Sequence, residues 1–226
     1  MSNLNNLDSS VVEGQAVYKP FTLAIYDLLV IWFSNSYIWR CPAKNIRQLF
    51  AENMSANHLD IGVGTGYFLR KELARTHQQD PRLGLMDLNE HSLKSAEAAI
   101  AKYTGFIELY QDNILGDVQS IAKPFDSISI NYLLHCIPGT IAEKTKKTLI
   151  NIEKLASPNA KVFGSTIVAD QPNSLAQKLM TFYQGKGIFH NQQDTEAELT
   201  KILESRLHDV SIQRIGSVVL FSGRVQ

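Results

Sequence analysis

Glycines and a carboxylate near residue 60 have a spacing that suits ligand binding. The segment from Asp60 to Gly66 reads Asp-Ile-Gly-Val-Gly-Thr-Gly and follows a short apolar run. Glycine lets the backbone turn tightly and approach a ligand without a Cβ in the way. Where such a loop opens a helix, the helix N-terminus favours an anionic group. A plain glycine-rich turn is the alternative, so the residues that follow must decide between the two.

Two further carboxylates follow at the ends of later apolar runs. Asp87 lies about 20 residues beyond the loop, the position at which a carboxylate binds ribose hydroxyls in nucleotide-binding sheets. Asp112, with the Asn113 amide beside it, is placed to accept a hydrogen bond from an exocyclic adenine amine. An exposed acid at a strand end is the alternative for Asp87, and a helix N-cap is the alternative for Asp112.

The glycine spacing argues against a dinucleotide site. Such sites use Gly-x-Gly-x-x-Gly, in which the third glycine allows close packing of helix on strand. Counted from Gly62, the sixth position is Tyr67, and Gly66 comes one place early. The loop therefore implies no pyrophosphate cradle.

Histidines and tyrosines supply the candidates for acid–base chemistry and for contacts to a second ligand. His135 follows the fourth expected strand, and the ordinary pKa of histidine suits proton transfer near neutrality. Its apolar neighbours also fit a structural, hydrogen-bonded histidine. His190 lies in a glycine-containing loop that is either a lid hinge or a surface loop. We expect Tyr132, His135, Tyr183 and His190 to contact substrate, and we interpret His58 in the first strand as structural.

Alternating strands and helices must position these residues. The hydrophobic patterns predict strands at 58–61, 82–86, 106–110, 125–132, 161–168, 210–215 and 218–224, and helices at 67–75, 89–102, 142–155, 175–183 and 195–207. Strands separated by helices form a parallel sheet, and ligands bind at the carboxyl ends of its strands. The last two strands are joined too tightly for a crossover, so they are antiparallel.

The predicted fold is a doubly wound, seven-stranded, mostly parallel α/β sheet with one reversed edge strand. Residues 1–50 are expected to form a tail and a helical cap over the site, and residues 51–226 the Rossmann-like domain. The apolar run 21–33 is interrupted by Asp27 and is too short to span a bilayer.

Composition narrows the possible partners. The 226 residues include 22 basic and 22 acidic ones, and a net charge of zero argues against binding nucleic acid through its phosphates. Cys41 and Cys136 form no disulfide framework, and the six histidines show no metal-ligand spacing, so we expect no metal site. The polar start carries no secretory signal. These features predict a cytoplasmic protein that binds neither membrane nor nucleic acid; a monomer and a homodimer both remain open.

Together, these motifs resemble those of a known enzyme family. Asp60 to Gly66, Asp87, Asp112-Asn113 and the run from Asn131 to His135 are similar to the ordered motifs of class I S-adenosylmethionine-dependent methyltransferases. The resemblance covers roughly residues 57–168. Segments at 18–20, 39–42, 66–69, 131–138 and 185–189 also resemble small bacterial methyltransferases of the type 12 kind, several of which are associated with secondary metabolites.

The resemblance implies a cofactor and the residues that hold it. The cofactor is S-adenosyl-L-methionine, and the product is S-adenosyl-L-homocysteine (SAH). The residues implied at the methionine end are Tyr18, Asp60, Gly62, Gly64, Gly66 and Asn131. At the adenosine end they are Asp87 for the ribose hydroxyls, Leu88 against adenine, and Asp112 with Asn113 for the adenine amine.

The implied activity is methyl transfer by in-line displacement to a small-molecule acceptor, aromatic or heterocyclic. His135 is the candidate base if the acceptor must lose a proton. A nucleic-acid methyltransferase is the first alternative, although Asn131-Tyr132-Leu133-Leu134 lacks the prolines that shape a slot for a flipped base. A non-catalytic protein that binds the cofactor is the second. A nicotinamide oxidoreductase is the third, and the glycine spacing disfavours it.

Overall fold

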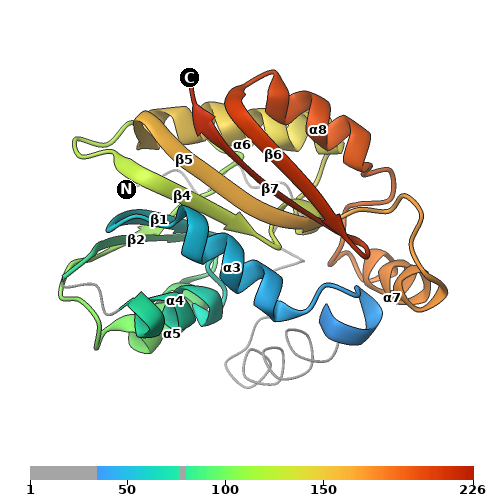
Figure 1. The fold of residues 1–226 in the computed structure, drawn as a ribbon, viewed down its shortest axis with the longest axis horizontal. Coiled ribbons are helices and arrows are strands. Elements are labelled where there is room, and N and C mark those ends of the chain that lie inside the picture. The colour runs from blue at the N-terminus through green and yellow to red at the C-terminus, as the bar shows by residue number, and fades with distance from the viewer. Residues whose placement is uncertain (1–34, 77–79) are drawn as a thin grey trace.

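The computed structural model describes residues 35–76 and 80–226, which form a seven-stranded sheet (Figure 1). The strand order is β3-β2-β1-β4-β5-β7-β6. The strands are β1 (Asn57–Ile61), β2 (Arg82–Asp87), β3 (Ile107–Gln111), β4 (Phe125–Asn131), β5 (Ala156–Ile167), β6 (Leu207–Ile215) and β7 (Val218–Val225). The first five strands are parallel to one another, so the predicted doubly wound, mostly parallel sheet is confirmed.

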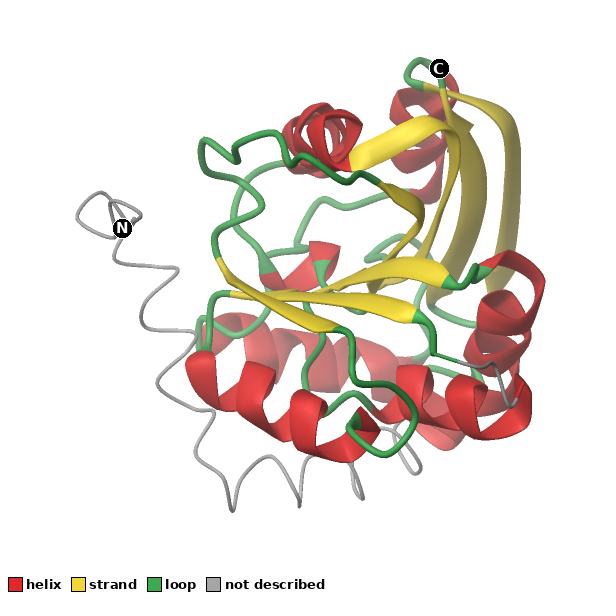
Figure 2. Cartoon of the chain, turned by 90° about the vertical axis from the view of Figure 1, so that its left-hand side faces the viewer, coloured by secondary structure: helices red, strands yellow, loops and turns green. Residues whose placement is uncertain are grey.

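Helices pack on both faces of the sheet (Figures 1 and 2). On one face lie α6 (Ile141–Leu155) and α8 (Glu196–Glu204); on the other lie α3 (Ala43–Asn53), α4 (Tyr67–Thr76) and α5 (Glu90–Ile100). Two buried apolar clusters separate these helices from the sheet. The remaining helix, α7 (Ser174–Gly185), lies at one end of the sheet. In the described parts of the chain, no helix has the length and apolar character needed to cross a membrane.

Local signals in the sequence set where two of these helices begin. The Asn89 side chain accepts a hydrogen bond from the His91 N–H and caps α5. Thr140 and Glu143 form a reciprocal capping box at the start of α6. Both helices therefore begin near the carboxyl ends of the strands that precede them, β2 and β4.

The reversed strand is not at the edge of the sheet, so that part of the prediction is wrong. β7 is antiparallel to both β5 and β6 and lies between them, and β6 is the edge. Four consecutive residues of β7, Val218 to Phe221, are buried, whereas the exposed and half-buried positions of β6 alternate. An interior strand is covered on both sides, and β7 is the more apolar of the two strands and occupies that position.

Residues 112–124, between β3 and β4, form turns, and they bury Ile114 and Val118 in the core. One boundary differs from the prediction. β5 begins at Ala156 and not at Lys161, because Phe125 of β4 pairs with Ala156 across an irregularity in the register. Ser157 and Pro158 thus lie in the strand instead of a loop.

The expected boundary at residue 50/51 lies within α3, which packs on α4, β5 and β7. The segment 35–38 before it forms a π-helical turn. Tyr18 and the other residues up to 34 lie outside the described residues. The division into a cap and a domain stays a prediction.

Candidate active site

The glycine loop follows β1 directly and has the backbone conformation that glycine favours. Gly62, Gly64 and Gly66 have φ values of +71°, +54° and +70°. A Cβ at Gly62 would lie 3.0 Å from the Leu133 side chain, and one at Gly66 would lie 3.1 Å from Ala96. A Cβ at Gly64 would meet nothing within 4 Å. The outer two glycines thus allow close packing within the protein, whereas Gly64 leaves space free beside the loop.

Asp87, the last residue of β2, connects this loop to the start of α5. Its Oδ2 accepts a hydrogen bond from the Gly64 N–H at 3.4 Å, and its Oδ1 accepts one from the Asn89 N–H at 2.9 Å. Burial raises the pKa of Asp87, although these backbone N–H groups oppose the rise. The carboxylate is therefore oriented from two sides at the carboxyl end of its strand.

Asp60 lies one strand away and is buried, with 6% of its surface exposed. Its Oδ1 accepts a hydrogen bond from the Ser129 hydroxyl on β4. Burial raises the pKa of Asp60 to about 7, and the nearby charge of Asp87 adds to the rise. Asp60 can therefore change charge near neutral pH.

Asn131, the last residue of β4, has a half-satisfied side chain. Its Oδ1 accepts a hydrogen bond from the Ser165 hydroxyl at 3.1 Å. Its Nδ2 is buried and has no hydrogen-bond partner among the described residues. An orphaned buried donor costs free energy, which an acceptor supplied by a ligand would offset.

The turn after β3 carries Asp112 and Asn113. The Asn113 N–H donates to Asp112 Oδ1 at 2.7 Å, and the Leu115 N–H donates to Asn113 Oδ1 at 2.9 Å. No helix begins here, so the N-cap alternative for Asp112 does not apply. On the neighbouring strand the Leu88 carbonyl accepts from Gln111 Nε2 at 3.4 Å, which joins the two turns.

His135 lies in the short 3₁₀ helix η3 (Leu134–Cys136) and is 2% exposed. Its Nδ1 is 3.4 Å from both the Ile167 N–H, which donates to it, and the Thr166 hydroxyl. Burial, together with the charge of Lys144, lowers the pKa of His135 to about 3. The imidazole is neutral at pH 7, and its Nδ1 lone pair is directed at the backbone. This geometry favours the structural alternative for His135, while the catalytic role stays a prediction.

Aromatic side chains surround His135. Its ring centre is 4.5 Å from that of Phe189, which is 4.9 Å from Tyr183 and 6.0 Å from Trp39. Tyr132 has a left-handed φ of +54°, and its ring centre is 6.0 Å from that of His135. Burial beside Cys41 raises the pKa of the Tyr132 phenol well above its usual value.

His190 also joins this group, through its backbone. Its N–H donates to the His135 carbonyl at 2.7 Å, and its own carbonyl accepts from Lys144 Nζ at 2.8 Å. The structure thus brings together the four residues expected to contact substrate, Tyr132, His135, Tyr183 and His190. Sequence reasoning missed Lys144 and its partner Asp194, because a lysine on an amphipathic helix carries no signal that it is buried.

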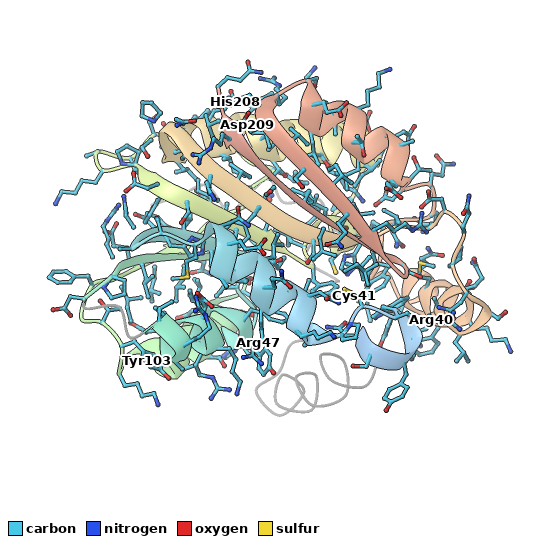
Figure 3. All side chains as sticks on the ribbon, viewed as in Figure 1. Arg40, Cys41, Arg47, Tyr103, His208 and Asp209 are labelled. Carbon is cyan, nitrogen blue, oxygen red and sulfur yellow. The ribbon has the colours of Figure 1, made fainter. Side chains whose placement is uncertain are left out.

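A metal centre finds no support in residues 35–76 and 80–226, where no group of three His, Cys, Asp or Glu side chains could hold an ion. His208 pairs with Asp209 at 3.4 Å. Figure 3 shows this pair at the start of β6, far from Cys41.

The residues present fit an adenosylated amino acid. The positions singled out follow the carboxyl ends of β3, β2, β1 and β4, which are adjacent in the sheet. At this edge lie the free space beside Gly64, an oriented carboxylate at Asp87 and an orphaned amide at Asn131. A ligand with ribose and carboxylate groups requires space beside the loop, a carboxylate that accepts from the ribose hydroxyls, and an unpaired donor for its own carboxylate.

Comparisons with known proteins agree with this geometry. The family model described as "Methyltransferase domain" matches residues 59–162. The chain is 40% identical over 194 residues to the putative uncharacterized protein YbcY of Escherichia coli (strain K12), covering 84% of this chain and 96% of that one. It is 33% identical over 195 residues to demethylluteothin O-methyltransferase of Streptomyces thioluteus, covering 85% and 83%.

Among solved structures, the DhpI–SAH complex matches with a TM-score of 0.68 and 15% identity. The match covers 97% of this chain and 98% of that one, so the two share the whole fold. By fold, motif geometry and relatives at 33% and 40% identity, the chain belongs to the class I S-adenosylmethionine-dependent methyltransferases and is an enzyme of that family.

Proposed function

We propose that this enzyme methylates a small-molecule acceptor with a hydroxyl group. The proposal is supported by the demethylluteothin O-methyltransferase relative and by the aromatic residues Trp39, Tyr132, Tyr183 and Phe189 around His135, which suit a flat apolar acceptor. The chain's zero net charge supports an acceptor other than nucleic acid. Cys41 and Cys136 are both free thiols, which supports a reducing compartment such as the cytoplasm.

The observation that carries the cofactor assignment is the convergence of Gly64, Asp87 and Asn131 at one edge of the sheet. Bound there, the cofactor supplies an electrophilic methyl group. Asp87 would accept from the ribose hydroxyls, with Leu88 against the adenine and Asp112 and Asn113 at its amine. The residues proposed for the methionine end are Tyr18, Asp60, Gly62, Gly64, Gly66 and Asn131.

The protein's own contribution to transfer is placement and exclusion of water. Much of the acceleration of a displacement comes from holding the reacting atoms in line, about 3 Å apart. Phe189 and Trp39 are both nearly fully buried, and apolar surroundings of this kind would favour a displacement in which charge is lost from the cofactor's sulfonium. A hydroxyl acceptor must also lose a proton, and His135 is the candidate that we test below.

The test is calorimetric titration with S-adenosylmethionine, SAH and NAD, with Asp87→Asn as the test variant. The matched control is Asp126→Asn, because Asp126 lies near the start of β4, at the end of the sheet opposite to Asp87, and accepts from Asn57 and Ser157. We expect the adenosyl ligands alone to bind, the Asp87 variant to lose at least tenfold in affinity, and the control to bind as wild type does. Binding of NAD but not SAH would overturn the proposal. A panel of phenolic acceptors with isotopically labelled cofactor then tests the acceptor class.

A further inference from the structure

A buried series of hydrogen bonds joins β1 to β4 and ends at Asp60. The Ser129 hydroxyl donates to Asp60 Oδ1, and Ser129 Oγ lies 3.1 Å from His58 Nε2. On the other side of the ring, His58 Nδ1 lies 2.8 Å from Ser127 Oγ. The strand register pairs His58 with Ser127 and Asp60 with Ser129, so the parallel ladder itself aligns the series. His58, Ser127 and Ser129 have no exposed surface.

The direction of these bonds is fixed while Asp60 is ionised. A serine hydroxyl has a single hydrogen, and the Ser129 hydrogen goes to Asp60. Ser129 must then accept from His58, so Nε2 carries the imidazole hydrogen. Nδ1 is left as an acceptor for the Ser127 hydroxyl, whose oxygen itself accepts from the Ser55 N–H at 2.8 Å.

The same atoms also satisfy one another in the opposite direction. If Asp60 takes up a proton, it donates to Ser129, Ser129 donates to Nε2, and an Nδ1–H donates to Ser127. The Ser127 hydroxyl then has an acceptor in Ser55 Oγ at 2.9 Å. The carboxyl, the imidazole and the two β4 hydroxyls hold three hydrogens in the first state and four in the second, so one proton is gained and the imidazole is neutral in both.

We propose that His58, through Ser129, is a positioning residue for Asp60, and that reversal of this hydrogen-bond series lets Asp60 gain or lose the charge that it presents to the ammonium group of the cofactor. The proposal rests on the function proposed above, in which Asp60 holds that ammonium group. It assigns a role to His58, which the sequence alone suggested was structural.

The side chains around the series keep His58 neutral, so the proton that is gained or lost near neutral pH is that of Asp60. His58 packs against the rings of Phe50 and Phe163, whose centres are 6.0 and 5.6 Å from its own. Burial there lowers the pKa of His58 to about 3, so the ring does not become an imidazolium near neutrality. In the described part of the chain, the charged group that acts on Asp60 is Asp87, which raises the pKa of Asp60 further; Ser129 and His58 face it as neutral groups.

The first experiment compares SAH with 5′-methylthioadenosine, which has the adenosine but no ammonium group, by calorimetry from pH 5.5 to 8.5. In wild type we expect SAH affinity to fall as the pH drops through about 7, where Asp60 is protonated, and 5′-methylthioadenosine affinity to stay constant. Loss of affinity for both ligands in parallel would overturn the charge assignment. Binding of neither ligand by wild type would instead refute the proposed function, so the two failures are distinguishable.

The variants test the series itself. Ser129→Ala removes the donor that favours ionised Asp60, so the acid midpoint for SAH should rise by about one pH unit, which weakens binding about fivefold at pH 7. His58→Phe keeps an aromatic ring packed against Phe50 and Phe163 and should raise the midpoint by less. Ser127→Ala removes an equally buried hydroxyl at the far end of the series, beyond His58, and should move the midpoint less than Ser129→Ala does. A midpoint unmoved in Ser129→Ala or His58→Phe, or moved as far in Ser127→Ala as in Ser129→Ala, would overturn the proposal.

A spectroscopic measurement on wild type alone keeps the proposal testable if the variants fold poorly. Nitrogen-15 spectra of labelled histidine distinguish the two neutral tautomers from imidazolium. We expect His58 to carry its hydrogen on Nε2 at pH 8.5 and on Nδ1 at pH 5.5. One unchanged tautomer, or an imidazolium, would contradict the reversal.

Discussion

Lys144 Nζ lies 2.7 Å from Asp194 Oδ2, and both side chains are almost completely buried, with 0% and 2% exposed. The ammonium also donates to the His190 carbonyl at 2.8 Å and the Ile137 carbonyl at 3.4 Å. The pair therefore fixes the segment between α7 and α8, which carries Phe189 and His190, against α6 and η3. Burial raises the pKa of Asp194 to about 6, and Lys144 opposes the rise.

Removing one partner of this pair should be strongly destabilising. Lys144→Met or Asp194→Leu leaves an uncompensated buried charge, which costs about 3–5 kcal/mol of unfolding free energy. The double variant Lys144→Met/Asp194→Leu removes both charges and should recover most of that loss. Urea unfolding at pH 7.5 measures all four proteins. Single variants within about 1 kcal/mol of wild type would show that the pair is not charged in the folded protein.

The glycine loop allows a prediction in which stability and binding separate. Gly62→Ala and Gly64→Ala both place an alanine at positive φ, which costs about 1–2 kcal/mol. Gly62→Ala should cost more stability, because its Cβ would lie 3.0 Å from Leu133. Gly64→Ala meets no protein atom within 4 Å, and its Cβ would fill the space proposed for the cofactor.

We therefore expect the lower melting temperature in Gly62→Ala and, at a temperature where both are folded, the weaker SAH binding in Gly64→Ala. Thermal unfolding and calorimetry on the two purified variants provide the comparison. The opposite ranking in binding would remove Gly64 from the proposed cofactor site.

The sequence predicted those features that depend on local chemistry. The glycine loop and the strands expected at 82–86 and 125–132 follow from residue types and periodicity, and the structure has them as the loop after β1 and as β2 and β4, with bounds that differ by one residue. The interior position of β7 could not be predicted in this way. The hairpin turn fixes only that β6 and β7 are neighbours, and burial by other elements decides which of them is the edge.

The candidate site shows the same division. The order of its motifs along the chain led to Asp60, Asp87 and Asn131 without knowledge of the sheet. The partners Ser129 and Asp194 lie 69 and 50 residues from Asp60 and Lys144, and no pattern within either segment links them. Such contacts depend on strand register and helix docking, which a single sequence does not specify.

His135 should make the protein less stable as the pH falls. Its pKa is about 3 in the folded protein, against an ordinary value of 6.5, so the unfolded chain binds a proton between these values that the folded chain does not. This contribution to the unfolding free energy is fully present above pH 6.5 and falls by about 1.4 kcal/mol per pH unit below it. In His135→Phe the slope should decrease by that amount between pH 6 and 4, measured by urea unfolding. His91→Asn, at an exposed position of α5, is the control for the loss of one histidine.

The same variant tests the proposed base. Loss of a general base slows transfer by about 10²–10⁴-fold while SAH affinity is unchanged. If His135 is structural, His135→Phe should retain transfer within about tenfold of wild type, because the ring still packs against Phe189, whose centre is 4.5 Å away. Single-turnover rates with the first acceptor identified distinguish the two outcomes.

The orphaned amide of Asn131 leads to the last prediction. Asn131→Leu alone would leave the Ser165 hydroxyl without its acceptor, so the informative change is Asn131→Leu/Ser165→Ala, which removes both partners and the unpaired Nδ2. Replacing both partners by apolar groups is close to neutral for stability, and losing the orphaned donor favours the folded state. We expect the unfolding free energy to stay within about 1 kcal/mol of wild type while SAH binding weakens about tenfold or more. Binding of 5′-methylthioadenosine should change little, because the resemblance places Asn131 at the methionine end. Equal losses for the two ligands would move Asn131 to the adenosine end, and unchanged SAH binding would remove it from the site.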